Sequence, residues 1–380
     1  SSVDGGITPS NALKNPYPTG IDVPPGRSQG LATLVGRGFT FGNPDRSIPY
    51  VHQFSFGWQQ RLPWRIVAEA TYVGSRSRSL QVSRSINEVS AEQLKLGTAL
   101  NDLVANPFQG LLPGTAFNGA TVVRSQLLRP FPQFTGITRA FNNNGQSWYN
   151  ALQVQVEKRV THGLHFLVSY TLAKSIEAVG YLNAQDNDLA KVLTSVDAPN
   201  RLILSGSYDL PFLQNAAGFL QVFGGWKMNW IISLQSGLPV GTPSGAYSSG
   251  IDPRIPNDQR TRDHWFNTCT LSLTGVRQNC ATANEPVAFV VQPPFTLRTL
   301  STRFPNVRTS RPPQVDFSLF KAFRLHENLN LQLRAEAFNL TNTPWFGAPN
   351  TTLGGSAFGV VSPSQANDPR NVQIALKLVF

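Results

Sequence analysis

The sequence predicts an all-β protein: an antiparallel up-and-down transmembrane β-barrel that is an incomplete part of a larger barrel. Three observations predict this fold: long segments of alternating apolar and polar residues, connections that are alternately short and long, and a composition poor in charge. Only 14% of the 380 residues are charged, against about a quarter in an average soluble domain. A wall that faces lipid excludes charge, so this composition suits a membrane barrel.

Alternation with a period of two residues is clearest in residues 371–380, where every even position is apolar and most odd positions are polar or small. The same pattern recurs over 152–159, 226–235 and 329–337. Side chains two residues apart lie on the same face of a strand. The segments run to roughly ten residues, longer than the five or six of an ordinary strand and enough for a tilted strand to cross a membrane.

Nine strands are expected from this pattern. They cover residues 50–60, 64–74, 147–160, 164–176, 200–210, 225–235, 313–324, 329–342 and 371–380. Short and long connections alternate between them, as they do in outer-membrane barrels, where periplasmic turns are short and extracellular loops are long.

The barrel is therefore expected over residues 50–380, and residues 1–49 as an extracellular loop or an N-terminal cut-off segment. The expected extracellular loops are 75–146, 177–199, 236–312 and 343–370. An odd number of strands favours a cut-off larger barrel over a closed ten-strand barrel with an extra strand within 30–41, because bacterial single-chain barrels have an even number.

The formal charge of +11 first suggests a nucleic-acid partner. Lys and Arg are nevertheless spread thinly, without a run of five or six, and no nucleic-acid-binding motif occurs. We therefore expect no nucleic-acid partner and place the basic residues at a membrane rim or in a lumen. Aromatic residues near many strand ends, such as Trp64, Trp148 and Trp226, favour a membrane–water boundary there.

Charged residues at the inward positions of the alternating segments are candidates to face the lumen. They are Glu69, Glu157, Arg159, Asp316, Arg334 and Glu336. They could pair across the wall, contact a plug, or line a solute path. Aromatic and amide residues in the long loops are candidates for solute contact. These are Phe141, Asn142, Asn143, Asn144, Trp265 and Phe266.

Two cysteines, Cys269 and Cys280, lie in one Thr- and Asn-rich loop. No CxxC pattern points to a metal, and in an exported protein such a pair can form a local disulfide; two free thiols are the alternative.

Motifs of enzymes are absent from the sequence: there is no GxSxG elbow, P-loop or dinucleotide-binding glycine pattern. His264 beside Asp263 could serve a hydrolase, and Asp186 with Asp188 has a spacing that suggests calcium, but a solvated loop is the preferred interpretation of both. We expect no enzymatic activity, no cofactor and no metal.

Several stretches resemble the C-terminal half of the large TonB-dependent receptors of the Oar-like type, which carry a carboxypeptidase-regulatory-like domain. They are PYVHQF (49–54), EATYVGS (69–75), LRPFPQF (128–134), YNALQ (149–153), SYTLAKS (169–175), LQSGLP (234–239), RAEAFNL (334–340) and the terminal strand to Phe380. The resemblance covers nearly the whole chain from about residue 45.

This resemblance implies a bacterial outer-membrane receptor with a plugged barrel of about 22 strands, which binds and imports a large solute. The TonB complex would act only through an N-terminal plug, which this chain does not contain. Leu376, Leu378 and Phe380 look like the signal that the barrel-assembly machinery reads. Outer-membrane lipid is the other expected partner. The alternatives are a small passive porin or adhesin barrel and a soluble β-rich binding protein.

Overall fold

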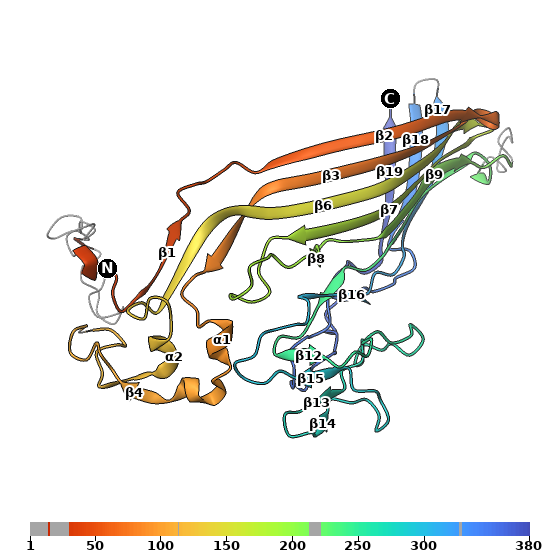
Figure 1. The fold of residues 1–380 in the computed structure, drawn as a ribbon. Helices are drawn as coiled ribbons and strands as arrows, with labels where there is room; N and C mark the ends of the chain where they lie inside the picture. Colours follow the sequence, from red (N-terminus) through yellow and green to blue (C-terminus); the bar gives the residue numbers. More distant parts are fainter. Residues whose placement is uncertain (1–13, 16–29, 113, 213–221, 327–328) are drawn as a thin grey trace.

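The computed structural model describes residues 14–15, 30–112, 114–212, 222–326 and 329–380. Its main feature is one large curved sheet, in which the long strands follow one another in chain order and run antiparallel (Figure 1). The long strands are β2 (Tyr50–Leu62), β3 (Ile66–Ser85), β6 (Gly136–Thr161), β7 (Leu164–Ala178), β9 (Asn200–Asp209), β10 (Trp226–Gln235), β17 (Gln314–His326), β18 (Leu329–Phe338) and β19 (Asn371–Val379).

A long strand lies at each of the nine positions that the alternation predicts, and their order is that of an up-and-down wall. Two short strands extend the sheet: β1 (Gly38–Gly42) pairs in parallel with the start of β6, and β8 (Val192–Leu193) pairs with the end of β7. Because β1 pairs over five residues only, the segment 30–41 does not supply a tenth strand that crosses the wall.

Strands β3 and β6 are longer than the sequence predicts, so the expected loop 75–146 is wrong at both ends. Residues 75–85 continue β3 and pair, with shifts in register, with the first part of β6. Polar residues occupy both faces there, as in the run SRSRS at 75–79. A strand that has water on both faces shows no apolar alternation, which explains the error.

The short turns lie at one end of the sheet together with the C-terminus, and the long loops lie at the other end (Figure 1). Strands β6 and β7 join through His162 and Gly163, whose φ angles of 51° and 75° are those of a tight hairpin turn. Between β2 and β3 lies the 3-10 turn η2 (Pro63–Arg65). The sequence also predicts a short turn at 326–328, of which residues 327–328 lie outside the described residues.

The strand register shows that the sheet has one apolar and one polar face. Directly opposed residues of antiparallel strands share a face. One row of such partners runs Phe56, Tyr72, Leu152 and Leu172 across β2, β3, β6 and β7. The neighbouring row on the other face runs Gln59, Glu69, Gln155 and Ser169 across the same strands.

Among the residues that the structure describes, no protein layer packs on the apolar face. On β19, Ile374 is 73% exposed and Leu376 is 67% exposed, and each is opposed by an apolar residue of β18 on the same face. An apolar sheet face of this extent is unfavourable in water. The arrangement is that of a wall with lipid on one side.

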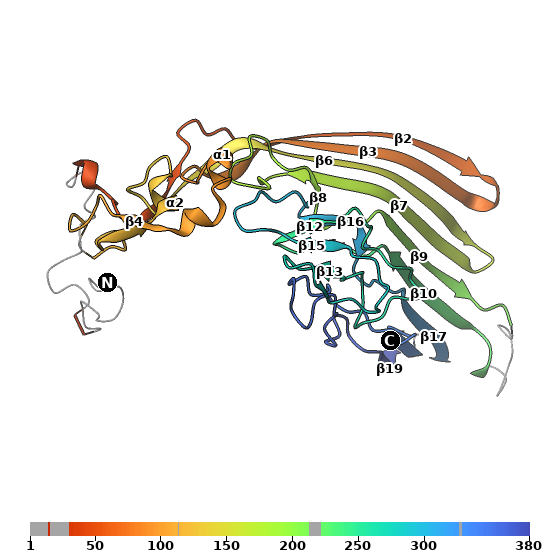
Figure 2. The ribbon, with the colours of Figure 1, turned by 60° about the horizontal axis from the view of Figure 1, so that its bottom comes forward.

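The buried core of the molecule lies in the loops. Residues of 236–312 and 343–370 fold together into a small domain, which we call the loop cap. Its strands are β11 (Pro239–Gly241), β12 (Ala246–Ser248), β13 (Thr270–Leu271), β14 (Arg277–Gln278), β15 (Phe289–Val291) and β16 (Arg303–Arg308). Its core consists of Val240, Ala246, Phe266, Ala288, Phe289, Phe304, Val307 and Phe358. The loop cap lies within the curve of the sheet, near its loop end (Figure 2).

The loop between β3 and β6 contains most of the remaining short elements. They are α1 (Ala91–Leu94), η3 (Gly97–Asn101), β4 (Leu103–Ala105), β5 (Thr121–Val123) and α2 (Arg124–Leu127), with η1 (Gly30–Ala32) before β1. In the described part of the chain, no helix is long and apolar enough to span a membrane.

Candidate functional site

Charged side chains predicted to face the lumen stand on the polar face of the sheet. Glu69 is opposite Gln155, and Glu336 is opposite both Ser318 and Gln373. By the same register Glu157, Asp316 and Arg334 belong to this face. Arg159 follows Glu157 by two residues, at the register shift before the turn.

Two of these residues, Arg334 and Glu336, are brought together with Lys227 and Asn229 around a hollow of about 340 Å³. The Arg334 guanidinium lies 5.1 Å from the ring centroid of Phe320. Lys227 and Asn229 were missed as candidates, although their alternation with Met228 and Trp230 already indicates that they face the same way. The polar face of β10, β17 and β18 therefore carries charges of both signs around one hollow.

The six candidates do not neutralise one another. No ion pair joins any of them to another residue in the part of the chain that the structure describes. Glu69 accepts a hydrogen bond from the Thr71 hydroxyl at 3.0 Å. Asp316 accepts one from the backbone N–H of Asn339 at 2.9 Å, so its carboxylate anchors the end of β18.

Four of the residues expected in a solute-contacting loop lie in strand β6 instead. Asn142 is buried, and its amide donates to the carbonyl oxygens of Val82 at 2.9 Å and Arg139 at 3.0 Å. That residue holds a register shift in the ladder and is not free to contact a solute. Phe141 and Asn144 are exposed at the loop end, and Asn144 donates to the Tyr181 hydroxyl at 2.8 Å. The amide of Asn143 donates to the carbonyl of Asp45.

The aromatic pair expected in the second long loop also has a structural role. Phe266 is 0% exposed and packs against Phe289, Phe304 and Phe358 in the core of the loop cap, so its assignment to solute contact is wrong. Trp265 is half-buried, and its indole N–H donates to the Arg308 carbonyl at 2.7 Å. An apolar core needs large side chains, and these aromatics supply it.

Cys269 and Cys280 are joined by a disulfide. Cys269 is fully buried at the start of β13, next to the aromatic core. The bond links the two ends of the segment that forms the β13–β14 hairpin. It therefore restricts the β13–β14 hairpin of the loop cap.

Two ion pairs attach the loop cap to the end of β7 and to the loop that follows it. Arg303 contacts Glu177 at 2.7 Å, and Arg308 contacts Asp197 at 2.7 Å. The Asp197 side chain is only 2% exposed, and it also accepts the backbone N–H of Ser175 at 2.7 Å. Because Asp197 is buried, loss of its cation would leave an uncompensated buried charge, which is strongly destabilising. The cap is consequently held in a fixed position against the sheet.

Neutral contacts complete this attachment. The side chain of Asn183 donates to the Arg298 carbonyl at 3.0 Å and accepts the Arg298 N–H at 2.7 Å. Desolvation lowers the pKa of the Arg298 guanidinium from its ordinary value, although an arginine remains charged at neutral pH.

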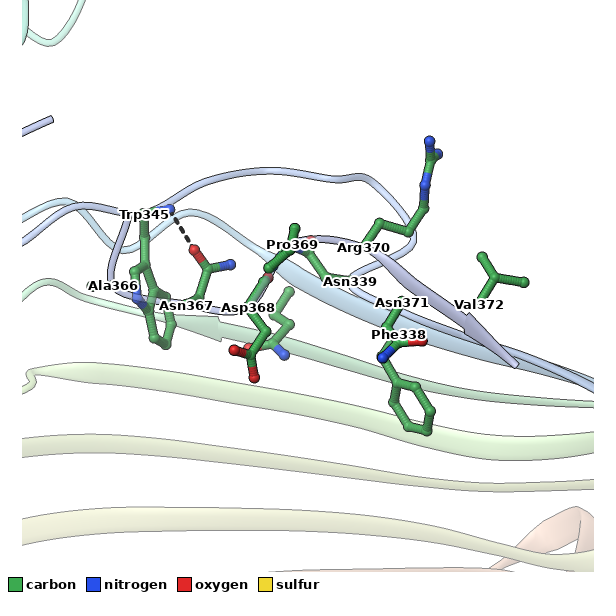
Figure 3. Close-up of a pocket in the computed structure, with 11 residues that line it drawn as sticks. Phe338, Asn339, Trp345, Ala366, Asn367, Asp368, Pro369, Arg370, Asn371 and Val372 are labelled. Atoms are coloured by element: carbon green, nitrogen blue, oxygen red, sulfur yellow. Dashed lines mark hydrogen bonds between the residues drawn. The ribbon is translucent and has the colours of Figure 1, made fainter. Parts of the chain in front are cut away.

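A second hollow, of about 800 Å³, opens where the ends of β18 and β19 meet the loop 343–370. Trp345, Asp368 and Arg370 contribute to its wall, and the last two side chains point in opposite directions (Figure 3). The backbone N–H of Trp345 donates to the side-chain oxygen of Asn367 at 2.9 Å. The Arg311 guanidinium lies over the Trp345 ring, 3.5 Å from the ring centroid. No pattern of the sequence predicted this hollow, because its walls come from separate segments.

Within the described ranges, no three His, Cys, Asp or Glu side chains gather in a way that could hold a metal ion. His264 lies 3.0 Å from Glu285, and Asp186 accepts the N–H of Asn183 at 2.8 Å in a local turn. Both segments that had an alternative interpretation as a hydrolase or calcium site thus have local structural contacts.

Three solved structures to which the chain shows similarity are outer-membrane proteins. The outer membrane transporter YddB from Escherichia coli matches at 10% identity and a TM-score of 0.42, over 90% of this chain and 34% of that one. The pyoverdine outer membrane receptor FpvA from Pseudomonas aeruginosa matches at 9% and 0.39, over 86% and 29%. The ferric-catecholate import receptor Fiu from E. coli matches at 12% and 0.36, over 89% and 28%. The chain thus spans about a third of the length of these proteins.

No curated protein matches the chain. The family model described as outer membrane beta barrel domain matches residues 1–373. This match covers nearly the whole chain and confirms the barrel fold and the bacterial outer-membrane location that the sequence predicts. The chain belongs to the outer membrane beta barrel domain family.

Proposed function

We propose that this chain is the C-terminal barrel part of a TonB-dependent receptor, which binds a large solute and imports it, and that its role is transport rather than catalysis. The observation that carries the proposal is the open sheet. In the described part of the chain, β2 and β19 each have a single neighbour and do not pair with each other. Lipid cannot satisfy the backbone groups of a strand edge, so further strands must complete the wall.

A wall completed in this way has more than the nine long strands of this sheet and encloses a wide lumen. The unpaired charges on the polar face support a lumen in which these side chains meet polar groups from outside the described sheet. Glu157, Arg334 and Glu336 have no ionic partner among the described residues. We propose that they contact a plug or line the solute path.

For solute contact we propose the loop end of the sheet. The hollow beside Trp345 combines an aromatic ring with amide and charged groups. Phe141, Asn143, Asn144 and Trp265 remain candidates elsewhere at the loop end. A large polar solute is recognised by such a combination of stacking and hydrogen bonding. The loop cap would limit access to the lumen from that side.

The partners follow from the same architecture. The TonB complex would act through an N-terminal plug, and lipid would cover the apolar face. The barrel-assembly machinery would read β19, where Leu376 and Leu378 lie on the apolar face and Phe380 follows the strand.

The topology can be tested in intact cells. An epitope inserted after Gly275, in the exposed β13–β14 hairpin, should bind antibody on unbroken cells. An epitope inserted after His162, in the short turn between β6 and β7, should bind only after the outer membrane is opened. The reverse result would place the loops in the periplasm and would overturn the proposal.

The plugged receptor and the passive porin are separated by conductance. The complete protein, purified from outer membranes, is added to a planar bilayer in potassium chloride. A plugged receptor should pass no steady current, whereas an open porin should pass an ohmic one. A steady single-channel current from the intact protein would favour the porin and would contradict import through a plugged barrel.

A further inference from the structure

The apolar face of the sheet ends in a group of cations at its loop end. On β3, Ile66, Ala68, Ala70, Tyr72 and Gly74 belong to this face, and the next two positions of the same parity are Arg76 and Arg78. On β7 the apolar series ends at Leu172 and is followed by Lys174. We call Arg76, Arg78, Lys174 and Lys191 the basic rim.

The register shows that these cations lie at one level of the wall. Arg76 is opposite His52 of β2 and Trp148 of β6. Lys174 is opposite Asn150 of β6. The apolar series of β3 and of β7 therefore both end in cations at nearly the same height, with Asn150 and Trp148 of β6 between them.

The height of the rim corresponds to the edge of a hydrocarbon layer. From Ile66 to Gly74 the apolar series of β3 covers eight residue steps, which is about 26 Å along a strand at about 3.3 Å per residue. A tilt of about 40° reduces this to about 20 Å, close to the apolar band of an outer-membrane barrel. Arg76 and Arg78 then lie at the level of lipid headgroups.

Carboxylates do not neutralise the rim. In the described residues none of the four cations is in an ion pair. Arg76 donates only to neutral acceptors, the carbonyls of Ser75 and Tyr149 at 2.9 Å and the Asn150 side chain at 2.8 Å. Lys174 is exposed.

An aromatic ring stands at the centre of the rim. The Trp148 ring lies 5.3 Å from the Lys191 ammonium and 6.0 Å from the Arg78 guanidinium. A hollow of about 480 Å³ beside it is lined by Trp148, Lys191 and Asp188, among others, and Asp188 makes no ion pair with Lys191. The site thus offers positive charge, a ring and space next to an apolar surface.

The turn end of the apolar face is different. Its two lysines are Lys158 and Lys321. Lys158 donates to the Trp64 carbonyl at 2.9 Å, and Lys321 is buried and donates to the Gly224 carbonyl. Backbone groups of the protein therefore hold the cations at that end, whereas the lysines of the basic rim are open to a ligand.

We propose that the basic rim binds the phosphate-bearing headgroup of a membrane lipid whose acyl chains lie against the apolar face of β3, β6 and β7. Arg and Lys are the side chains that recognise phosphate, and an amphiphile is the ligand that matches cations directly above an apolar band. The site assignment rests on the register. Only the placement of the site in the outer leaflet rests on the proposed function.

The test compares two double variants of the complete protein in detergent micelles. Native mass spectrometry measures the binding of lipid A with two phosphates. K174Q/K191Q removes two rim charges without touching the hydrogen bonds of Arg76, and R254Q/R324Q removes two exposed charges elsewhere. Each cation near an anionic surface changes binding by a factor of about five, so the rim variant should bind about 25-fold more weakly. The control variant should bind like the wild type.

Three results would overturn the proposal: equal loss in both variants, equal binding of lipid A from which the phosphates have been removed, or full displacement by millimolar inorganic phosphate. The last would indicate a site for a free anion. Heat-modifiable gel mobility verifies that both variants are folded. Reversed epitope accessibility would refute the proposed topology and leave lipid binding at the rim intact, so the two proposals fail separately.

Discussion

A pair of adjacent substitutions tests which face of the sheet meets lipid. Val154 lies on the apolar face of β6, between Ala70 and Tyr170. Gln155, the next residue, lies on the polar face between Glu69 and Ser169. Val154→Arg places a cation on the apolar face, whereas Gln155→Arg places the same side chain on the polar face of the same strand, one residue away.

The position of Val154 determines the magnitude. It is four residues from Lys158, which marks the turn end of the apolar face, and four residues from Asn150, which marks the loop end. The substituted arginine therefore lies near the midplane, where it destabilises a membrane barrel by about 2–4 kcal/mol. This corresponds to a change of about 30-fold to nearly 1000-fold in the ratio of folded to unfolded protein. Gln155→Arg should change stability by less than about 1 kcal/mol, because its side chain remains in water.

The assay is a urea titration of each variant refolded into phospholipid vesicles, followed by heat-modifiable gel mobility. Val154→Arg should lower the midpoint and Gln155→Arg should leave it nearly unchanged. If Gln155→Arg were the more destabilising of the two, the polar face would be the one that meets lipid or a dry interior. The assignment of the wall would then be wrong.

The remaining predictions concern the loop cap. Arg308→Ala leaves the buried carboxylate of Asp197 without its cation and should destabilise the cap by about 3–5 kcal/mol, seen as faster amide hydrogen exchange in β16. The double variant Cys269→Ser/Cys280→Ser removes the disulfide across an 11-residue separation and should destabilise the cap by about 3 kcal/mol, measured by its rate of proteolysis. Phe266→Ala should cost about 3–5 kcal/mol, measured by the same exchange experiment.

A surface ion pair provides the control for Arg308→Ala. Lys95 contacts Glu92 at 2.8 Å, but both side chains are largely exposed. Lys95→Ala should therefore change the free energy of unfolding by less than about 1 kcal/mol. Equal effects of the two substitutions would show that the Arg308 pair does not hold the cap.

The long strands could be predicted because the two sides of a membrane wall differ so strongly. Where one face meets lipid and the other meets water, apolar and polar residues must alternate, as Val154 and Gln155 do. The prediction failed in residues 75–85, where the strand continues beyond the apolar band and all residues but Leu80 and Val82 are polar. The backbone hydrogen bonds between β3 and β6 continue there, but the residues no longer alternate between apolar and polar.

The loop cap could not be predicted, because its contacts are non-local. Phe266 packs against Phe358, 92 residues later in the chain. In the sequence, an aromatic residue of a solute site cannot be distinguished from one that packs in a core, because both stand among polar loop residues. The prediction that Asn142 contacts a solute was wrong for a related reason. Its amide satisfies carbonyls at a register shift, which only the paired strands reveal.

The sheet edges determine what kind of wall these strands belong to. Strand β2 runs for 13 residues and has β3 as its one neighbour among the described residues. About half of its backbone groups point away from β3, and each such group left unpaired in hydrocarbon costs several kcal/mol. Their sum exceeds the roughly 5–15 kcal/mol that stabilises a whole domain. Strand β19 presents the same problem at the other edge. Pairing of the two edges with each other would close a narrower barrel around the loop cap, which lies within the curve of the sheet (Figure 2). Further strands between β19 and β2, as proposed above, would satisfy both edges and would leave the cap where the ion pairs of Arg303 and Arg308 hold it.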